Sequence, residues 1–487
     1  MWGNVLDYAE ITINVTGPKA PAAPENIELK SIQRGFSISL IFEGLAYQYP
    51  ANVDKVEIYV SKTSGFNPKG WSGTAWNGAP NNPLDWDGET NNLYAVNKPS
   101  NPLIINDLIP GTTYYIKVVN LDTFNQRSVP SEEKSGIPLD VPRSSTYTVA
   151  ASDSNYTNSG ADYICNGTSD QDTINAAINN LPSGGGTITL TEGTFVIDGP
   201  VNLISNMILQ GQGKNTIIKL QNNSSNAYMI YGNEISGSQI RDLVIDGNKT
   251  NISVIEIDGI LINNCNDITL YGVHVREARR HGIVIDGASS QISISKSNIH
   301  NNFWRGISGT MINSLISDNM INNNIDGIHV YDSRGMTVSN NTVFENTLGV
   351  GIRMTYSSNG SINNNVSHDN GEDGIIIVQS SNNNIIGNNC YANGASSAQV
   401  FDVAQIMVQG FPSEYNAIQH NICRVGDNQY KAKYGIRIND NECRYTLISS
   451  NDCYQSGTTA GVSNAGTNTN FGAGNRNNNG TWSATPN

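Results

Sequence analysis

DGILIN, at residues 258–263, is the first copy of a short phrase that returns throughout the second half of the chain. Its later copies are HGIVID at 281–286, RGISGT at 305–310, DGIHVY at 326–331, GIRMTY at 351–356, DGIIIV at 373–378, AQIMVQ at 404–409 and GIRIND at 435–440. The first copies follow one another every 21–24 residues, and the last two belong to enlarged units. A period in the low twenties is typical of stacked supersecondary units rather than of a series of separate domains.

Each copy alternates apolar and variable residues, which is the pattern of a β-strand with one buried face. A second strand follows in each unit, as in ITLYGVHV at 268–275 and MTVSNNTV at 336–343. Asn-rich corners lie between the strands, and Asn tolerates the left-handed backbone that a tight corner needs. Stacked Asn side chains can also hydrogen-bond along the stack. The leucine-rich-repeat signature and its helix are absent, so the sequence predicts an all-β fold, a right-handed parallel β-helix.

Composition narrows the classes of partner. The 487-residue chain has a net charge of −14 and a pI near 4.8, which argues against nucleic acid, because phosphate binding needs a basic surface. No apolar run is long enough to span a membrane, so we expect no membrane insertion. The six cysteines form no C-x-x-C pair, and we interpret them as core residues rather than as a disulfide framework. We expect no cofactor and no metal site.

The N-terminal third differs in pattern from the repeats. Residues 1–20 hold one strand-like run and a Pro/Ala linker, interpreted as the end of an upstream domain. Separated alternating strands at 21–141 predict a β-sandwich, and LIPGTTY at 108–114 resembles the fibronectin type III signature, with Tyr114 in the tyrosine-corner position. A Trp-rich insert at 64–97 could pack on this module or stack on sugars. Its acidic residues at 85, 87 and 89 could hold calcium, although the calcium-loop pattern is incomplete.

The predicted β-helix occupies residues 142–460, followed by a C-terminal cap or tail at 461–487. SDQDTINAAINNLPSGGG, at 169–186, predicts a helix capped by Asp170, with Ile174, Ala177, Ile178 and Leu181 on one face. Such a helix would cover the open end of the solenoid, which otherwise exposes its core. GTITLTEGTFVI at 186–197 and LQGQGKNTIIKL at 209–220 resemble the start of pectate-lyase-like β-helix domains.

Alternation predicts which side chains leave the core. The inward column is Ile260, Ile283, Ile307, Ile328, Ile352, Ile375, Ile406 and Ile436. Polar and aromatic outward residues gather on the middle coils, where Asp286, His329, Tyr331 and Arg353 lie. Because neighbouring strands are about 4.8 Å apart, His329 and Arg353 should be side by side. In β-helix enzymes of the pectate-lyase-like class the substrate lies along the outer face of one sheet, so this patch is either a glycan site or a set of ordinary surface residues.

A second set of ionisable residues directly precedes the repeat glycines, at a corner where alternation does not assign a direction. Asp326 and Asp373 belong to it and are two strands apart, about 10 Å, close to the carboxyl separation of inverting glycosidases. Asp-Gly is also simply a favoured turn pair. The candidate catalytic residues are Asp326, Asp373, His329 and Asp286, and the candidate substrate-binding residues are Tyr331, Arg353, Arg305 and Tyr356.

Two enzyme families offer partial likenesses. NIDGI at 324–328 is similar to the N-T-D-G element of polygalacturonases, whose Asp is catalytic. The Asp-Asp pair expected one coil later is replaced by LGVG at 348–351, so this likeness stops at Asp326. Mannuronan C5-epimerases carry an Asp-Pro-His on the strand, where this chain has Val284, Ile285 and Asp286 without the His.

The order of modules resembles tail-associated proteins of phages and prophages, which join fibronectin-like modules to a capped β-helix that recognises or cleaves host glycans. This resemblance implies a depolymerase of a bacterial surface polysaccharide or exopolysaccharide, at the virion tail or outside the cell. It also implies an upstream tail component as partner and a homotrimer. We favour glycoside hydrolysis by a carboxyl pair. The alternatives are a lyase or epimerase-like enzyme acting on an acidic glycan, a non-enzymatic glycan-binding adhesin, and a structural surface solenoid.

Overall fold

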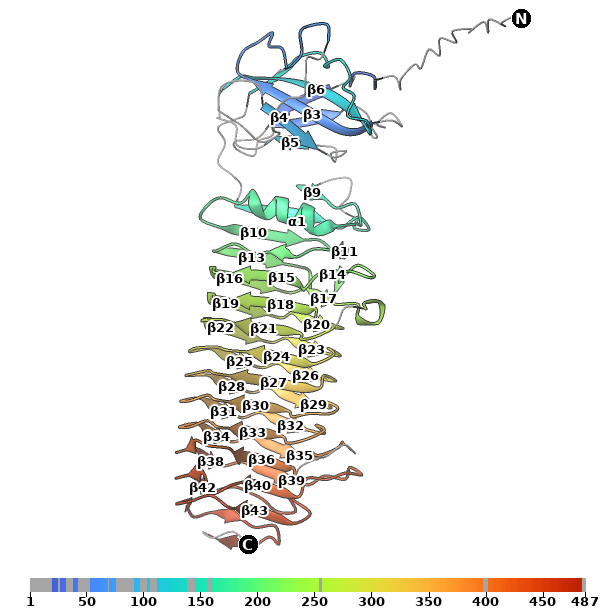
Figure 1. Ribbon diagram of the computed structural model, residues 1–487. Helices are drawn as coiled ribbons and strands as arrows, with labels where there is room; N and C mark the ends of the chain where they lie inside the picture. The colour runs from blue at the N-terminus through green and yellow to red at the C-terminus, as the bar shows by residue number, and fades with distance from the viewer. Residues whose placement is uncertain are drawn as a thin grey trace, which may run out of the picture. The chain divides into compact units, whose positions relative to one another are not determined.

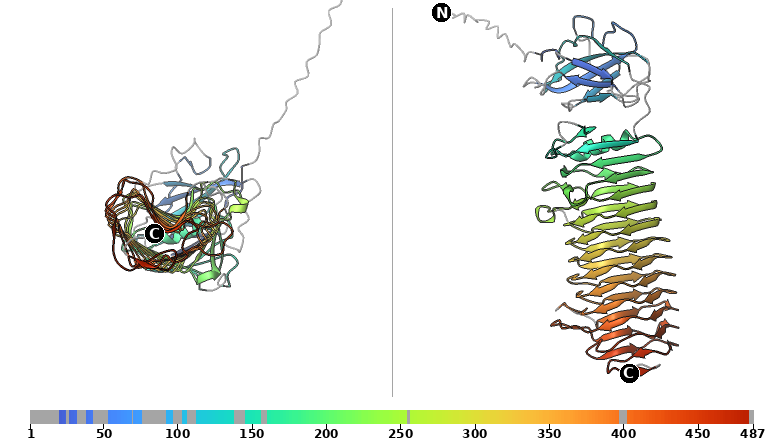
Figure 2. Two further views of the ribbon diagram at one scale, coloured as in Figure 1. Left: turned by 90° about the horizontal axis from the view of Figure 1, so that it is seen from below. Right: turned by 180° about the vertical axis from the view of Figure 1, so that it is seen from behind.

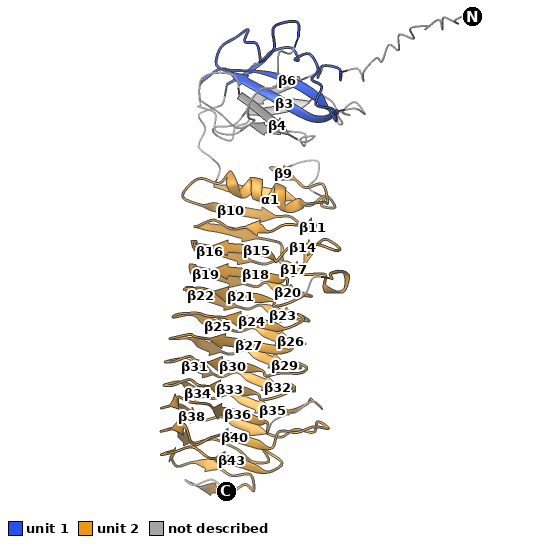
Figure 3. Ribbon diagram, in the orientation of Figure 1, with its two compact units in different colours: residues 1–143 blue, residues 144–487 orange. Residues whose placement is uncertain are grey.

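The computed structural model describes residues 20–24, 27–31, 38–42, 53–68, 70–75, 92–96, 103–105, 112–137, 145–155, 160–253, 256–396 and 402–483. The chain divides into two compact units, Met1–Arg143 and Ser144–Asn487 (Figure 3). The predicted strand before residue 16, and Trp76, Trp86 and the acidic residues of the insert, lie outside the described residues.

The first unit contains two antiparallel sheets. One has the strands β1 (Ile27–Ser31), β2 (Ile38–Phe42) and β5 (Leu103–Ile105), and the other has β4 (Asn92–Val96), β3 (Val53–Ser61), β6 (Tyr114–Asp122) and β7 (Lys134–Gly136). Tyr114 begins β6 and is fully buried, and Glu57 of β3 is buried against Arg127 at 2.7 Å. The fibronectin type III assignment itself stays a prediction.

The second unit is a stack of parallel coils built from three long sheets (Figure 1). Sheet I contains β9 (Tyr163–Ile164), β8 (Thr146–Ala150), β10 (Gly186–Leu190), β13 (Met207–Gln210), β16 (Ser236–Arg241), β19 (Asn266–Tyr271), β22 (Ser290–Ser295), β25 (Leu315–Ser317), β28 (Thr337–Ser339), β31 (Ser361–Asn363), β34 (Asn384–Ile386), β38 (Ala417–Gln419), β42 (Leu447–Ser449) and β44 (Asn470–Phe471).

Sheets II and III complete each coil. Sheet II contains β11 (Gly193–Ile197), β14 (Thr216–Leu220), β17 (Val244–Asp246), β20 (His274–Arg276), β23 (Asn298–His300), β26 (Met320–Asn322), β29 (Thr342–Phe344), β32 (Val366–His368), β35 (Asn389–Tyr391) and β39 (Ile422–Arg424). Sheet III contains β12 (Val201–Asn202), β15 (Tyr228–Asn233), β18 (Asp258–Asn263), β21 (Ile283–Asp286), β24 (Arg305–Gly309), β27 (Asp326–Tyr331), β30 (Ile352–Thr355), β33 (Ile375–Val378), β36 (Ala404–Gln409), β40 (Tyr434–Ile438) and β43 (Ala460–Asn464).

Most coils therefore have three strands, and the expectation of a single second strand in each unit was wrong. A residue with left-handed backbone divides that segment, as Gly272 (φ 62°) separates β19 from β20 and Asn340 (φ 56°) separates β28 from β29. The parallel pairing continues past residue 460 through β43 and β44, so the described coils extend beyond the boundary expected there. Figure 2 shows the stacked coils end on and from behind.

Short elements occupy the corners and the end of the stack. They are the 3-10 helices η1 (Gly213–Asn215) and η2 (Lys249–Asn251), the parallel pair β37 (Ser413–Glu414) and β41 (Cys443–Arg444), and the antiparallel pair β45 (Asn475–Arg476) and β46 (Trp482–Ser483). The helix α1 (Asp170–Asn179) starts one residue after Ser169, so Asp170 is its first residue rather than its cap. Ile174 and Ile178 on its predicted face are buried against the first coils.

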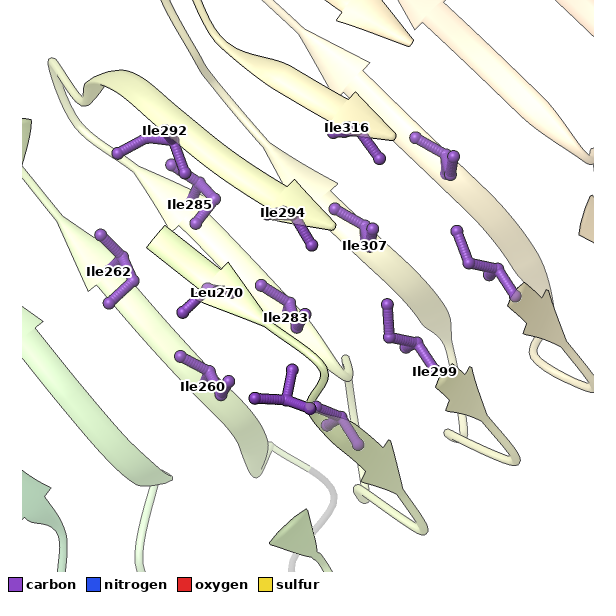
Figure 4. Packing of buried hydrophobic residues seen from close by; sticks show 14 of the residues in the cluster. Ile260, Ile262, Leu270, Ile283, Ile285, Ile292, Ile294, Ile299, Ile307 and Ile316 are labelled. Atoms are coloured by element: carbon purple, nitrogen blue, oxygen red, sulfur yellow. The ribbon is translucent and has the colours of Figure 1, made fainter. Parts of the chain in front are cut away.

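The predicted inward column is confirmed. All eight isoleucines of that column are fully buried, and in register neighbouring strands place one above the next, as Ile260, Ile283 and Ile307 show (Figure 4). All six cysteines are buried and free, as expected for core residues. Stacking identical branched side chains excludes water along the whole axis of the coil, which is the main stabilising contribution in this unit.

Two Asn ladders hold the corners at constant spacing. Ladder 1 consists of Asn302, Asn324, Asn346, Asn370 and Asn393, and ladder 2 of Asn319, Asn341, Asn365, Asn388, Asn421, Asn451 and Asn475. In each, the side-chain oxygen accepts hydrogen bonds from the backbone and side-chain N–H groups of the previous Asn, as Asn324 does at 3.0 Å from both nitrogens of Asn302. The expectation that amides bond along the stack is confirmed.

The apolar part of the outer face of sheet III is covered within the chain. Ile376 and Met407 are each 3% exposed and pack with Val350 and Ala404 and with the partly buried Tyr434. The enlarged units supply Ala404 and Tyr434, so this face is not an open surface that requires a neighbouring subunit. Among the described residues, no helix is long and apolar enough to cross a membrane.

Candidate active site

The candidate site lies where the strands of sheet III begin. Ladder 1 runs along this corner. Asn302 lies three residues before Arg305 of β24, and Asn324 lies two residues before Asp326 of β27. The register pairs Arg305 with Asp326 and Ser308 with His329, and the next pair of strands places His329 beside Arg353. The predicted neighbourhood of His329 and Arg353 is therefore confirmed, and the fixed amide ladder explains why these side chains keep their spacing.

The three Asp side chains at this corner each make the same kind of hydrogen bond to the backbone. Asp258, Asp326 and Asp373 each accept a backbone N–H from the following coil, at 3.1 Å from His281, 3.0 Å from Val350 and 2.7 Å from Ala404. Such a bond satisfies a donor that the corner would otherwise leave without a partner. The recurrence of Asp before the repeat glycine thus has a structural cause.

Asp326 also has an arginine beside its second oxygen, as Asp258 has Arg280. Its Oδ2 lies 3.4 Å from Nε of Arg305, and its side chain is 11% exposed. A Cβ at Gly349 would come within 2.1 Å of the Asp326 Oδ1, so the glycine leaves the space that this carboxylate occupies. Asp326 is therefore held both by the coil and by a group of the site.

Asp373 is less suited to chemistry than its sequence position indicates. It is 6% exposed, and burial raises the pKa of its carboxyl to about 7. Its neighbour Glu372, which sequence reasoning missed, is the carboxyl that faces the site: its Oε2 lies 3.8 Å from the guanidinium of Arg353. Burial raises the pKa of Glu372, Arg353 lowers it in part, and Asp326 raises it further. The two carboxyls of the patch are thus Asp326 and Glu372.

Two histidines of the patch are neutral at neutral pH. Burial, together with Arg305 and Arg353, lowers the pKa of His329 to about 4, and burial with Arg305 and Arg280 lowers that of His281 to about 3. The Nε2 of His329 lies 3.2 Å from Oγ1 of Thr355. Two positively charged neighbours per ring disfavour a further positive charge, and burial removes the water that would stabilise it.

Aromatic rings border the histidines. Tyr331 meets the His329 ring edge to face at 5.7 Å between centroids, and burial and Asp286 raise the pKa of its hydroxyl. Trp304 stacks on His281 at 5.2 Å and remains 44% exposed. Sequence reasoning missed Trp304 because it lies two residues before the repeat glycine, in the corner, where no alternation operates.

Three side-chain nitrogens of the patch are buried and have no hydrogen-bond partner within the described part of the chain. They are Nδ1 of His281, Nδ1 of His329 and Nε of Arg353. Buried polar groups in folded proteins almost always have partners, so a cluster of exceptions calls for a ligand or bound water. No group of His, Cys, Asp and Glu among the described residues is arranged to hold a metal ion.

The remaining predicted site residues stand apart from this cluster. Asp286 is exposed at the end of β21, and its Oδ1 accepts the N–H of Gly287 at 2.8 Å. Tyr356 is 58% exposed in the turn after β30, with a left-handed backbone at φ 51°. The structure therefore brings Arg305, Asp326, His329, Tyr331 and Arg353 together and leaves these two outside.

The second half of the chain matches a known family. Residues 258–401 and 309–478 match the family described as the right handed beta helix region. No curated protein matches the chain in sequence. The three parallel sheets run through the matched region and also extend before it, from β8 (Thr146–Ala150) onward.

Several solved structures share the fold at low identity. The A-module of a mannuronan C-5 epimerase from Azotobacter vinelandii is 20% identical over 62% of this chain and 93% of that one, with a TM-score of 0.45. The Dettilon tailspike protein is 17% identical over 65% of this chain and 68% of that one, with a TM-score of 0.48. A DFA-IIIase from Arthrobacter chlorophenolicus A6 is 13% identical over 66% of this chain and 86% of that one, also with a TM-score of 0.48. At these TM-scores the matches carry no argument about activity. What the family match and the sheets establish is that the second unit folds as a right-handed parallel β-helix.

Proposed function

We propose that this chain is an enzyme that cleaves a bacterial surface polysaccharide or exopolysaccharide by glycoside hydrolysis. The observation that carries the proposal is a pair of carboxyls in one patch, Asp326 beside Arg305 at 3.4 Å and Glu372 beside Arg353 at 3.8 Å. Two carboxyls in different environments are what acid–base cleavage of a glycosidic bond requires.

The environments assign the roles. Burial and Asp326 raise the pKa of Glu372, which keeps its proton available for the glycosidic oxygen as the bond to the anomeric carbon breaks. Asp326 takes a proton from the water that adds to that carbon. The two residues belong to coils two strands apart, about 10 Å between backbones, which suits an inverting enzyme with a water between base and sugar. Asp373 has a positioning role, because its carboxyl bonds to the next coil.

A lyase or epimerase-like reaction on an acidic glycan is the second candidate. The observation that favours it is the neutral His329, whose Nδ1 has no partner among the described residues. A neutral imidazole can take the proton next to a sugar carboxylate, while Arg353 on the adjacent strand would stabilise the charge that develops there.

We place this activity in a phage or prophage tailspike-like protein, at the virion tail or outside the cell, with an upstream tail component as partner. The support is the predicted fibronectin-like module at 21–141 followed by a β-helix capped by α1. The homotrimer is part of the same proposal, and light scattering that returns the 52.5 kDa mass of one chain would contradict it.

The test is incubation with a panel of purified bacterial capsular polysaccharides and exopolysaccharides. Hydrolysis releases reducing ends without ultraviolet-absorbing unsaturated sugars, and NMR of the first product shows an inverted anomeric configuration. Unsaturated products would establish the lyase instead. Binding without any cleavage would make the chain an adhesin, and neither binding nor cleavage across the panel would overturn the proposal.

A further inference from the structure

Arg353 is a half-buried guanidinium whose hydrogen-bonding capacity is unused within the described part of the chain. Its side chain is 29% exposed, and its nearest acidic atom, Oε2 of Glu372, lies 3.8 Å away, beyond hydrogen-bonding distance. Its Nε is buried without a partner. A guanidinium carries five N–H donors and loses part of its hydration on burial, so an arginine held in this way needs an acceptor from elsewhere.

Three other arginines of sheet III and its corner do have acceptors. Arg280 bonds to both oxygens of Asp258, and Arg437, which occupies the same outward column as Arg353 on β40, bonds to Asp402 at 2.6 Å. Arg305 contacts Asp326 and the hydroxyl of Ser308 at 3.3 Å. The missing acceptor therefore does not follow from the position of Arg353 on the strand. Arg279, at the corner before β21, also has a buried Nε without a partner among the described residues, but its guanidinium lies over the Phe303 ring at 4.9 Å.

Two histidines near Arg353 also have a buried nitrogen without a hydrogen-bond partner in the described part of the chain. His329, next to Arg353 on β27, and His281, which is 7% exposed, each have an unpartnered Nδ1. Burial, together with Arg305 and Arg353 for His329 and with Arg305 and Arg280 for His281, lowers the pKa of both rings and keeps them neutral. A group with two or more negatively charged oxygens would supply acceptors to the guanidinium and could take a hydrogen bond from an imidazole N–H.

We propose that Arg353, with His329 beside it, forms a subsite for the oxyanion group of an acidic sugar. The inference rests on the proposed function, because it names the substrate class of the same site. The shared chemistry is a carboxylate of a uronic acid or of an acidic substituent, or a sulfate ester. Arg binds such groups through two parallel N–H bonds, which also fixes the orientation of the sugar ring.

The subsite has a consequence for the acid Glu372. Arg353 lowers the pKa of Glu372, against the effects of burial and Asp326. An anion bound to Arg353 offsets that charge, so an acidic substrate favours the protonated carboxyl that the reaction requires. Binding of an acidic glycan would thus favour the protonated form of Glu372, whereas binding of a neutral glycan would not.

The test measures binding without turnover, in a chain that carries Asp326→Asn. Calorimetry compares hexameric glucurono-, mannurono- and galacturono-oligosaccharides, the same compounds after reduction of their carboxyls to alcohols, and a sulfated neutral hexamer. We expect at least one acidic compound to bind about 10-fold to 100-fold more tightly than its reduced form, the range for a hydrogen-bonded charge. Arg353→Gln removes that preference, whereas the matched control Arg437→Gln, whose guanidinium has its own acceptor, leaves it in place.

Three outcomes would overturn the subsite: equal affinity for acidic and reduced forms in every series, equal losses for both forms in Arg353→Gln, or the same loss in Arg437→Gln. A preference for the sulfated hexamer alone would keep the oxyanion subsite and identify a sulfate as its ligand. A charge preference in a protein that cleaves no polysaccharide would support the subsite while contradicting the proposed hydrolysis, so the two failures are distinguishable.

Discussion

Ladder 2 and the candidate site are both made of buried polar side chains, yet they treat hydrogen bonds in opposite ways. Asn365 is fully buried and uses every bonding group it has: its Oδ1 accepts two N–H groups of Asn341, and its Nδ2 donates to Val338 and Asn388. In the site, by contrast, nitrogens of His281, His329 and Arg353 have no partner in the described chain.

The difference separates polar groups that hold the fold from polar groups that wait for a ligand. A saturated network in a low-dielectric interior stabilises one arrangement of the coils, whereas each unpaired buried donor costs free energy. The repeat supplies the saturated network in nearly every coil. His281, His329 and Arg353 are exceptions within coils that also carry the ladders, and an exception that costs stability is most readily explained by binding.

The largest effect should follow from breaking the ladder. Asn365→Ala removes four hydrogen bonds and takes the side-chain partner from the buried backbone N–H of Asn341 and from the carbonyl of Val338, while Nδ2 of Asn341 still donates to Ile316 and Ser339. At about 1–3 kcal/mol for each buried group, we expect a loss of roughly 4 kcal/mol in the free energy of unfolding. Urea unfolding followed by circular dichroism measures it. Asn363→Ala is the control, because this side chain is partly exposed at the end of β31, two residues before Asn365, and should change stability little.

Breaking the site should instead remove activity and leave the fold intact. Asp326→Asn keeps an oxygen that can accept the N–H of Val350 but cannot accept a proton from water. We expect turnover to fall about 100-fold or more, the usual contribution of a general base. Asp258→Asn is the matched control, since Asp258 has the same corner position, the same backbone bond and an arginine partner. Equal losses of turnover in the two variants would show that the corner, rather than the base, is what matters.

The pH dependence of stability tests how deeply Asp373 is buried. Its pKa is about 7 in the folded chain and about 3.9 in an unfolded one, so the folded state holds the proton between these values. Asp373 should therefore contribute a fall in the free energy of unfolding as the pH rises from about 4 to about 7, opposite in sign to the contributions of His281 and His329. Asp373→Asn, which cannot ionise, should abolish this fall and be more stable than the wild type above pH about 7. Asp286→Asn, at an exposed carboxyl, should leave the fall in place.

The sequence predicts the repeated core and the Asn ladders much better than it predicts the candidate site. Alternation fixes the direction of side chains within a strand, so the buried isoleucine column and the neighbours His329 and Arg353 followed from spacing alone. Asn-rich corners likewise indicated the ladders. Both inferences use a period, and a period survives in every copy of the repeat.

At the corner before the strands of sheet III the alternation of inward and outward residues stops, and the sequence did not predict which side chains face the site. Glu372 and Trp304 lie two residues before their repeat glycines, where the backbone turns and no rule assigns a direction. Gly349 replaces the Asp expected from the polygalacturonase likeness, and its missing side chain is what gives Asp326 its space. Signals did exist, since GED at 371–373 places two carboxyls side by side, but only the stacked coils show which of them faces Arg353.

The smallest expected effect is that of His281→Phe, which should change the free energy of unfolding in the opposite direction to Asn365→Ala in ladder 2. It therefore tests the difference between the site and the ladders most directly. His281 is 7% exposed with an unpartnered Nδ1, and its ring stacks on Trp304 at 5.2 Å. His281→Phe keeps a ring in that place and removes the unsatisfied nitrogen. We expect the free energy of unfolding to rise by about 1 kcal/mol, the lower end of the cost of an unpaired buried group, while Asn302→Leu in ladder 1 lowers it.

Acidification should enlarge the stabilising effect of His281→Phe. The pKa of His281 is about 3 in the folded chain and about 6.5 in an unfolded one, so the unfolded state takes up the proton first. The wild type therefore loses stability as the pH falls from about 6.5 towards 3, and the phenylalanine variant lacks this contribution to the loss. Urea unfolding at a series of pH values measures the difference. A variant that is less stable than the wild type at every pH would mean that Nδ1 has a partner in the free protein, such as bound water, and His281 would then belong with the ladders rather than with the site.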